Sequence, residues 1–161
     1  MGSEETGGFE TSPEKRIFLN YRRQDAPAHA GRLYEGLAER FGPGRVFRDV
    51  DAIHAGAEFV PKTEDTLDAA DAILVVIGRN WLGAMGHPGD FVRLEIAYAL
   101  RHHVKVIPVL VAGATMPAAD ELPPDLADLA RLHPCELPDE DWSSGVDALV
   151  KWLESEKSQG D

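Results

Sequence analysis

Short apolar segments alternate along the chain with longer segments in which apolar residues recur at helical spacing. In the segment Pro27–Phe41, for example, Ala30, Leu33, Leu37 and Phe41 fall on one face. The pattern predicts strands at 16–21, 45–48, 71–77, 104–111 and, more weakly, 135–137. It predicts helices at 27–41, 58–70, 90–102, 125–132 and 141–154.

This alternation is typical of right-handed βαβ crossovers, which build a parallel sheet. A closed eight-stranded barrel needs far more than the 161 residues present. We therefore expect an α/β fold: an open, doubly wound, mostly parallel five-stranded sheet with helices on both faces. The expected strand order is the flavodoxin-like 2-1-3-4-5.

The ends of the chain differ from the middle. Residues 1–14 are rich in Gly, Ser and Glu and are expected to be disordered, and residues 155–161 form an expected flexible tail. One domain, 15–154, remains. No apolar run approaches the roughly 20 residues that cross a bilayer, and no secretory signal opens the chain. A single cysteine, Cys135, fits a reducing compartment, so we expect a cytoplasmic protein without membrane contact.

Ligands of doubly wound sheets bind outside the carboxyl ends of the strands, so the loops there are the places to search. They contain no Gly-rich dinucleotide or phosphate loop, no zinc spacing and no Gly-x-Ser-x-Gly elbow. A phosphate-accepting receiver domain is also excluded, because Asp25 comes late and the third strand ends in Gly78. The net charge of −12 argues against a nucleic-acid surface. No metal site is predicted.

Two arginines follow the first strand in this acidic chain. Arg22 and Arg23 are suited to bidentate contacts with a phosphate or carboxylate, and equally suited to pairing with nearby acids in a solvated loop. After the second strand, Asp49 and Asp51 are more typical of caps for their own loop. After the third, Trp81 is expected to anchor its loop rather than line a pocket.

The segment Asp90–Leu100 (DFVRLEIAYAL) is the most informative stretch of the chain. The expected inward face of this helix carries Val92, Ile96, Ala99, Leu100 and His103. Phe91 and Glu95 are spaced i, i+4 and share a stripe at the border of that face. From position alone, a solvated surface carboxylate is the expected state of Glu95. Trp142 and Trp152 are expected in the core of the last helix, and Cys135 is expected to be packed rather than reactive.

Taken together, these stretches resemble the Toll/interleukin-receptor (TIR) domain family, particularly its bacterial branch. The segment 18–23 (FLNYRR) is similar to the family's first box, F-I-S-Y-R-R, with Asn20 in place of Ser. Residues 46–49 (VFRD), with Gly56 further on, resemble the second box and its long loop. The segment 90–100 is similar to the helix that carries the motif W-x-x-x-E. The resemblance runs from about residue 16 to 154.

The resemblance implies one of two activities. Some family members are adaptors that assemble through TIR–TIR contacts, and others cleave the nicotinamide–ribose bond of NAD⁺. Their catalytic glutamate corresponds to Glu95, and Phe91 replaces the tryptophan of the motif. The resemblance then assigns substrate binding to Tyr21, Arg22, Arg23, Asp49, Trp81 and Phe91. It assigns an assembly loop to Asp51, Ile53, His54 and Gly56.

The resemblance thus predicts an NAD⁺ glycohydrolase that self-assembles, serves bacterial anti-phage defence, and uses NAD⁺ as substrate with no cofactor. ADP-ribose, a cyclic product and a base-exchange product stay open. Expected partners are NAD⁺, other TIR copies and a sensor domain or protein. The alternative is a non-enzymatic scaffold acting through homotypic or host TIR contacts. A nucleoside-processing transferase is less favoured, because it explains neither the arginine turn nor the loop after the second strand.

Overall fold

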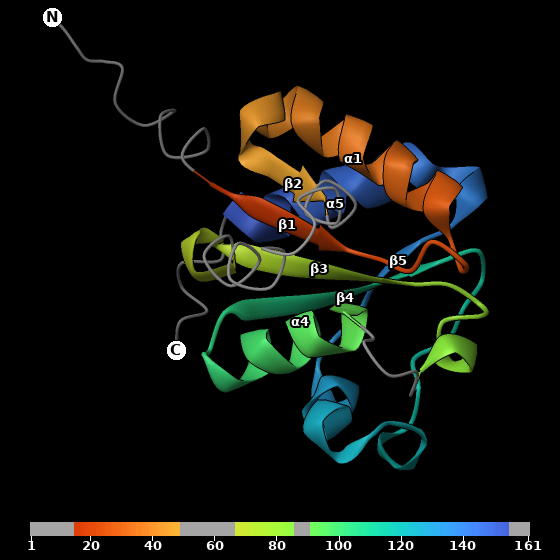
Figure 1. The fold of residues 1–161 in the computed structure, drawn as a ribbon. Helices are drawn as coiled ribbons and strands as arrows, with labels where there is room; N and C mark the ends of the chain where they lie inside the picture. The colour runs from red at the N-terminus through yellow and green to blue at the C-terminus, as the bar shows by residue number, and fades with distance from the viewer. Residues whose placement is uncertain (1–14, 49–66, 86–90, 155–161) are drawn as a thin grey trace, which may run out of the picture.

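The structure, a computed structural model, describes residues 15–48, 67–85 and 91–154. It contains five parallel strands in the order β2-β1-β3-β4-β5, so the predicted fold class and strand order are confirmed (Figure 1). The strands are β1 (Ile17–Asn20), β2 (Val46–Arg48), β3 (Ala72–Ile77), β4 (Lys105–Val111) and β5 (Cys135–Leu137). The expected tails, 1–14 and 155–161, lie outside the described residues.

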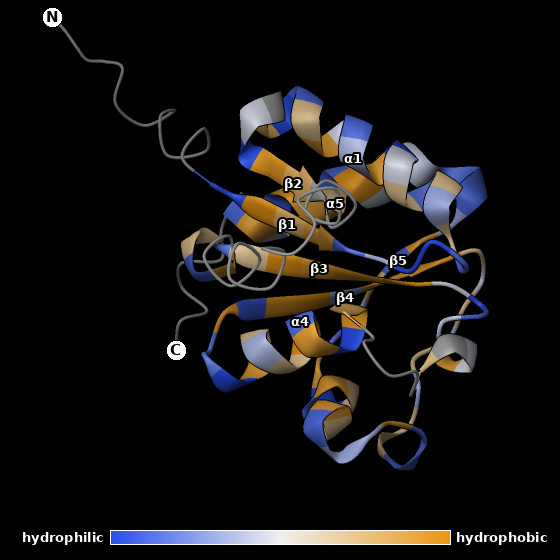
Figure 2. Ribbon diagram, in the orientation of Figure 1, coloured by the Kyte–Doolittle hydropathy of each residue, from blue (hydrophilic) through white to orange (hydrophobic). Residues whose placement is uncertain are grey.

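Helices cover both faces of the sheet. The α-helices are α1 (Pro27–Phe41), α4 (Phe91–Arg101) and α5 (Trp142–Glu154). Helices α1 and α5 pack on one face, and α4 packs on the other with the 3₁₀ helix η6 (Pro124–Arg131) (Figure 1). Alternate strand residues supply the two cores: Leu74 faces α1 and α5, whereas Ile73 and Val75 face α4. All six residues of β3 are buried, as expected of a central parallel strand, and Figure 2 shows this strand as uniformly apolar.

The helix boundaries follow local chemistry. Pro27 occupies the first turn of α1, where its missing N–H has no intrahelical partner to lose. The helix ends before Gly42, whose φ of 98° suits glycine. Helix α4 ends at Arg101, and His103 adopts a φ of 60°.

Three expectations about the elements need correction. The segment expected as an α-helix at 125–132 is instead the 3₁₀ helix η6. Trp142 belongs to the core, but Trp152 is only partly buried and packs against that core from α5. His103 was expected inward with α4 and is exposed, since the helix has already ended there. Of the helix expected at 58–70, only 67–70 are described.

The topology places a switch point between β1 and β3. From β1 the chain first adds β2 on one side, and β3 then pairs with the other side of β1. The strand order reverses at this pair, and such a switch point is the usual ligand position in doubly wound sheets. In the described part of the chain, no helix has the length and apolar character needed to cross a membrane.

Candidate functional site

Three polar side chains are buried in the described part of the chain, and they come from neighbouring segments. Asn20 ends β1, Arg22 follows it, and Glu95 lies on α4, with exposed fractions of 0%, 4% and 3%. Burying an amide, a guanidinium and a carboxylate is unfavourable unless each is compensated by contacts. Departures of this kind from a purely apolar core mark functional sites. The candidate site is therefore the carboxyl end of β1 and the first turns of α4.

Glu95 points into the protein rather than into solvent. The expectation from its position alone, a solvated surface carboxylate, is wrong. The reason is a partner distant in sequence: the Asn20 side-chain nitrogen donates a 2.8 Å hydrogen bond to Glu95 Oε1. Phe91, one turn earlier, is 37% exposed, so the two residues of the predicted stripe lie at different depths.

Asn20 makes a second contact with the same helix. Its side-chain nitrogen also donates to the backbone carbonyl of Val92, at 3.2 Å. In the sequence, Asn20 stands out only as a replacement for Ser in the first box. An Asn at the end of a strand whose other three residues are apolar was the signal that could have identified it.

The two arginines after β1 have different environments. Arg22 is buried, its Nη2 lies 3.3 Å from the sulfur of Met85, and its guanidinium carbon is 5.6 Å from the ring centroid of Trp81. That distance is within the range of a cation–π contact. Arg23 is exposed. Only Arg23 therefore presents its side chain to solvent.

Asp25 is a site residue that the sequence pattern does not indicate. Its carboxylate accepts hydrogen bonds from the backbone N–H groups of Gly78, at 2.7 Å, and Asn80, at 2.8 Å. A side chain at Gly78 would clash with this carboxylate, since a Cβ built there lies 2.6 Å from Asp25 Oδ1. Asp25 thus joins the loop after β1 to the loop after β3 across the switch point. A Gly at the carboxyl end of a buried strand was the available hint.

We expect Asp25→Asn to destabilise the protein by about 2 kcal/mol, because charge-assisted hydrogen bonds are lost and an amide N–H faces a backbone N–H. Urea denaturation followed by circular dichroism measures the free energy of unfolding. Glu39→Gln, at an exposed position on α1, is the control and should change it by less than about 0.5 kcal/mol. Equal stability of the two variants would contradict the joining role of Asp25.

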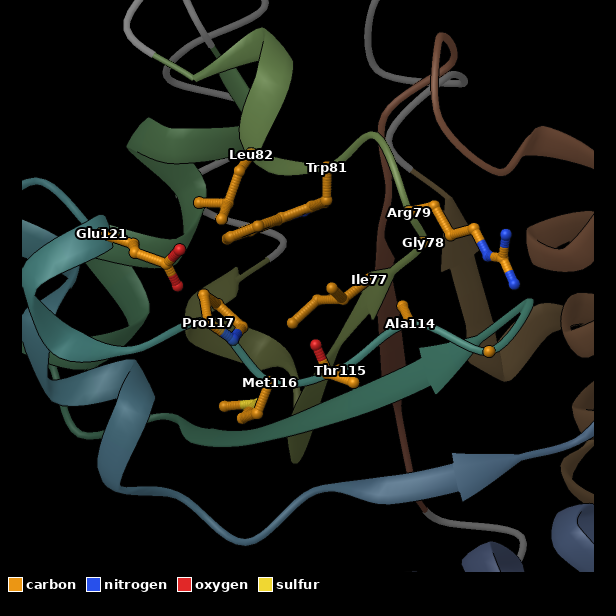
Figure 3. Close-up of a pocket in the computed structure, with 11 residues that line it drawn as sticks. Ile77, Gly78, Arg79, Trp81, Leu82, Ala114, Thr115, Met116, Pro117 and Glu121 are labelled. Atoms are coloured by element: carbon orange, nitrogen blue, oxygen red, sulfur yellow. The ribbon is translucent and has the colours of Figure 1, made fainter.

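A cavity of ≈ 240 Å³ lies beside the site, between the segment after β3 and the segment after β4. Ile77, Trp81 and Leu82 lie across from Met116 and Pro117, whereas Arg79 points away (Figure 3). The Arg79 Nε donates instead to the carbonyl of Ala112, at 2.8 Å. Trp81 is fully buried, as expected of an anchor, and it contributes both to this cavity and to the Arg22 contact.

Several predicted site residues lie outside the described residues: Asp49, Asp51, Ile53, His54 and Gly56. Tyr21 is described and is buried at 7% exposure. Across 15–48, 67–85 and 91–154, no three His, Cys, Asp or Glu side chains gather as they would around a metal ion.

Cys135 lies on β5, away from the candidate site. Burial, reinforced by the neighbouring Glu136 charge, raises the pKa of its thiol from 9.0 to about 11. A raised pKa means that the native state holds the neutral thiol. The contribution of this thiol to the free energy of unfolding is fully present below about pH 9. It is lost as the pH rises through about 11.

We therefore expect native Cys135 to react with iodoacetamide at pH 8 about 100-fold more slowly than in urea-unfolded protein, because the thiolate is the nucleophile. Mass spectrometry of the alkylated protein over time gives both rates. Free cysteine under the same two conditions controls for the effect of urea on the reagent. Equal rates in the folded and unfolded chain would show that burial does not protect the thiol.

The chain is similar to a known family in sequence and to solved structures in fold. A family model described as "TIR domain" matches residues 17–150. No curated protein matches the chain. Among solved structures, the chain is similar to the TIR domains in the activated Roq1 resistosome that directly recognises the pathogen effector XopQ. The TM-score is 0.66 at 16% identity, over 85% of this chain and 98% of that one.

A second similar structure is a metazoan TIR-STING receptor from C. gigas in complex with 2′,3′-cGAMP. Here the TM-score is 0.55 at 21% identity, over 89% of this chain. The alignment covers 40% of that receptor, so the similarity concerns only part of it. At these identities, both structures support the fold.

Proposed function

The chain belongs to the TIR domain family, and we propose that it is an NAD⁺ glycohydrolase that cleaves the bond between nicotinamide and ribose. One observation carries the proposal: Glu95 is a buried carboxylate that accepts a hydrogen bond from Asn20 at the carboxyl end of β1, next to the switch point between β1 and β3. A module that acts only through surface contacts has no need for a buried carboxylate at the usual ligand position.

The chemistry of the bond explains what this carboxylate does. Nicotinamide leaves as a neutral molecule from a cationic precursor, so its departure needs no general acid. The ribosyl centre left behind has oxocarbenium character, as in glycoside hydrolysis. A fixed negative charge beside that centre stabilises the transition state more than the ground state. In the proposal Glu95 supplies this charge and accepts hydrogen bonds from ribose hydroxyls.

Other residues have supporting roles. Arg23 is exposed beside the site and is suited to the diphosphate, whereas buried Arg22 fixes the Trp81 segment. Phe91 is the accessible aromatic ring near Glu95, and we assign it to stacking against the nicotinamide or adenine base. Water as acceptor releases ADP-ribose, and another nucleophile gives a cyclic or exchanged product.

Incubation of concentrated protein with NAD⁺, followed by chromatography of the products, tests the proposal. Release of nicotinamide together with ADP-ribose or an isomer supports it, and the second product identifies the acceptor. A properly folded protein that releases no nicotinamide at any concentration overturns it and favours the non-enzymatic scaffold.

The proposal includes self-assembly and a role in bacterial anti-phage defence, in which a sensor domain or protein triggers cleavage. One structural neighbour belongs to an activated resistosome, and the family model places this chain in the same family of domains. The segment 49–56, assigned to assembly from the sequence, borders the second strand on its carboxyl side.

We expect NAD⁺ turnover per molecule to rise with protein concentration, because a second copy is needed to complete the site. Each copy carries a net charge of −12, so moderate salt should favour assembly by screening repulsion. A concentration series at several ionic strengths measures this, with light scattering recorded in parallel. Gly56→Leu should lower turnover by altering the assembly loop. Constant specific activity, unaffected by this substitution, would show that one copy holds the complete site.

A further inference from the structure

The end of β1 carries a residue that apolar packing does not explain. Ile17, Phe18 and Leu19 are apolar and at most 1% exposed, and Asn20 follows them at 0%. Asn has a low preference for strands, and burying its amide is unfavourable unless hydrogen bonds compensate. An apolar side chain would suit the position better. Its contacts with α4 are therefore where a reason for Asn must be found.

The two contacts of Asn20 determine how its amide is oriented. Val92 offers a backbone carbonyl, which only accepts, so the amide nitrogen and not the oxygen must face it. The same nitrogen carries a second hydrogen, and that hydrogen meets Glu95 Oε1 at 2.8 Å. Turning the amide over would place its oxygen against two acceptors. Asn20 is thus a hydrogen-bond donor to the Glu95 side chain.

The same pair of contacts fixes Glu95 in direction. The Val92 carbonyl locks the plane of the amide relative to the backbone of α4, three residues before Glu95. The second N–H then leaves one favourable position for Oε1. A glutamate has three rotatable side-chain bonds, and without this contact they would let the carboxylate adopt other rotamers.

We propose that Asn20 is the positioning residue of the site: it holds the Glu95 carboxylate in one direction, and thereby sets the rate of the chemical step rather than substrate affinity. The inference rests on the proposed NAD⁺ cleavage. A misplacement of about 1 Å in a reacting group lowers rates by about 100-fold. Loss of Asn20 should therefore lower kcat strongly and leave KM nearly unchanged.

The kinetic test uses one matched pair of variants and one variant of nearly the same shape in which the donor becomes an acceptor. Asn20→Ser retains a hydroxyl donor and Asn20→Ala has none, so kcat should fall in the order wild type, Asn20→Ser, Asn20→Ala. Asn20→Asp, nearly the same shape, turns the donor into an acceptor and should lower kcat by about 100-fold with KM within about threefold. Val146→Ala, in the core between the sheet and α5, controls for loss of packing and should keep wild-type kcat well below its melting temperature. Equal kcat for the Ser and Ala variants, or a wild-type kcat in Asn20→Asp, overturns the proposal.

A melting experiment tests the contact without using activity. Asn20→Asp should lower the melting temperature, and the double variant Asn20→Asp/Glu95→Gln should recover part of that loss, because a Gln amide can donate to the new carboxylate. The single and the double variant both lack the Asn20 contact to the Val92 carbonyl, so its loss cancels from the difference between their melting temperatures. Strictly additive shifts overturn the contact. Wild-type protein that releases no nicotinamide overturns the proposed function, and the melting data then decide the Asn20–Glu95 contact by themselves.

Discussion

Glu95→Gln should lower NAD⁺ cleavage by about 1,000-fold while the protein stays folded. Gln keeps the length and shape of the side chain, and its oxygen still accepts the hydrogen bond from Asn20. What disappears is the negative charge beside the ribosyl centre. The expected change in the free energy of unfolding is less than about 1 kcal/mol, because the contact survives.

Initial rates of nicotinamide release, with urea denaturation on the same preparations, measure both effects. Glu35→Gln is a matched control, since it makes the same chemical change at an exposed position on α1 and should keep wild-type turnover. Full turnover by a stable Glu95→Gln protein would remove Glu95 from the mechanism.

The sheet was predictable because its order depends on local patterns. The alternation of apolar strands with amphipathic helices specifies parallel crossovers, and the handedness of these crossovers restricts the topology. The spacing of leucines in the sequence also indicates that η6 is a 3₁₀ helix. Leu126, Leu129 and Leu132 repeat every three residues, which is the period of a 3₁₀ helix rather than of an α-helix.

The interior of the site was not predictable in the same way. Glu95 lies at the edge of the apolar stripe of α4, and its burial depends on an amide 75 residues away in the sequence. The Asp25 contacts with Gly78 and Asn80 span 53 and 55 residues. No periodicity within a segment encodes such pairs, because they arise only once the sheet has brought the carboxyl ends of β1 and β3 together. Resemblance to a family identified Glu95, but it identified neither Asn20, which contacts Glu95, nor Asp25, which joins the loops after β1 and β3.

The burial of Arg22 is another feature that the local sequence does not predict. Adjacent arginines in a loop were expected to act alike, yet one is buried and the other exposed. The Arg22 guanidinium lies near the ring of Trp81 and the sulfur of Met85, both of which follow β3 in the chain. The arginine pair itself does not encode these contacts, because they come from a segment about 60 residues away in the sequence.

Trp81→Ala should destabilise the protein by about 3–5 kcal/mol, the range for removing a large buried aromatic side chain. Trp81 is fully buried, so the substitution leaves a cavity in the core beneath α4. It also removes the ring near the Arg22 guanidinium. Urea denaturation followed by circular dichroism measures the loss without relying on tryptophan fluorescence.

Trp81→Phe separates the anchoring role from a polar one. The indole N–H of Trp81 is buried and has no hydrogen-bond partner among the described residues, so a phenyl ring gives up no such contact there. We expect this variant to lose about 1 kcal/mol and to keep NAD⁺ cleavage. Trp152→Ala, at a partly buried position on α5, should lose less stability than Trp81→Ala. Should Trp81→Phe stay stable but lose cleavage, the indole N–H would be a contact to substrate, and the loop after β3 would belong to the binding site itself rather than to its frame.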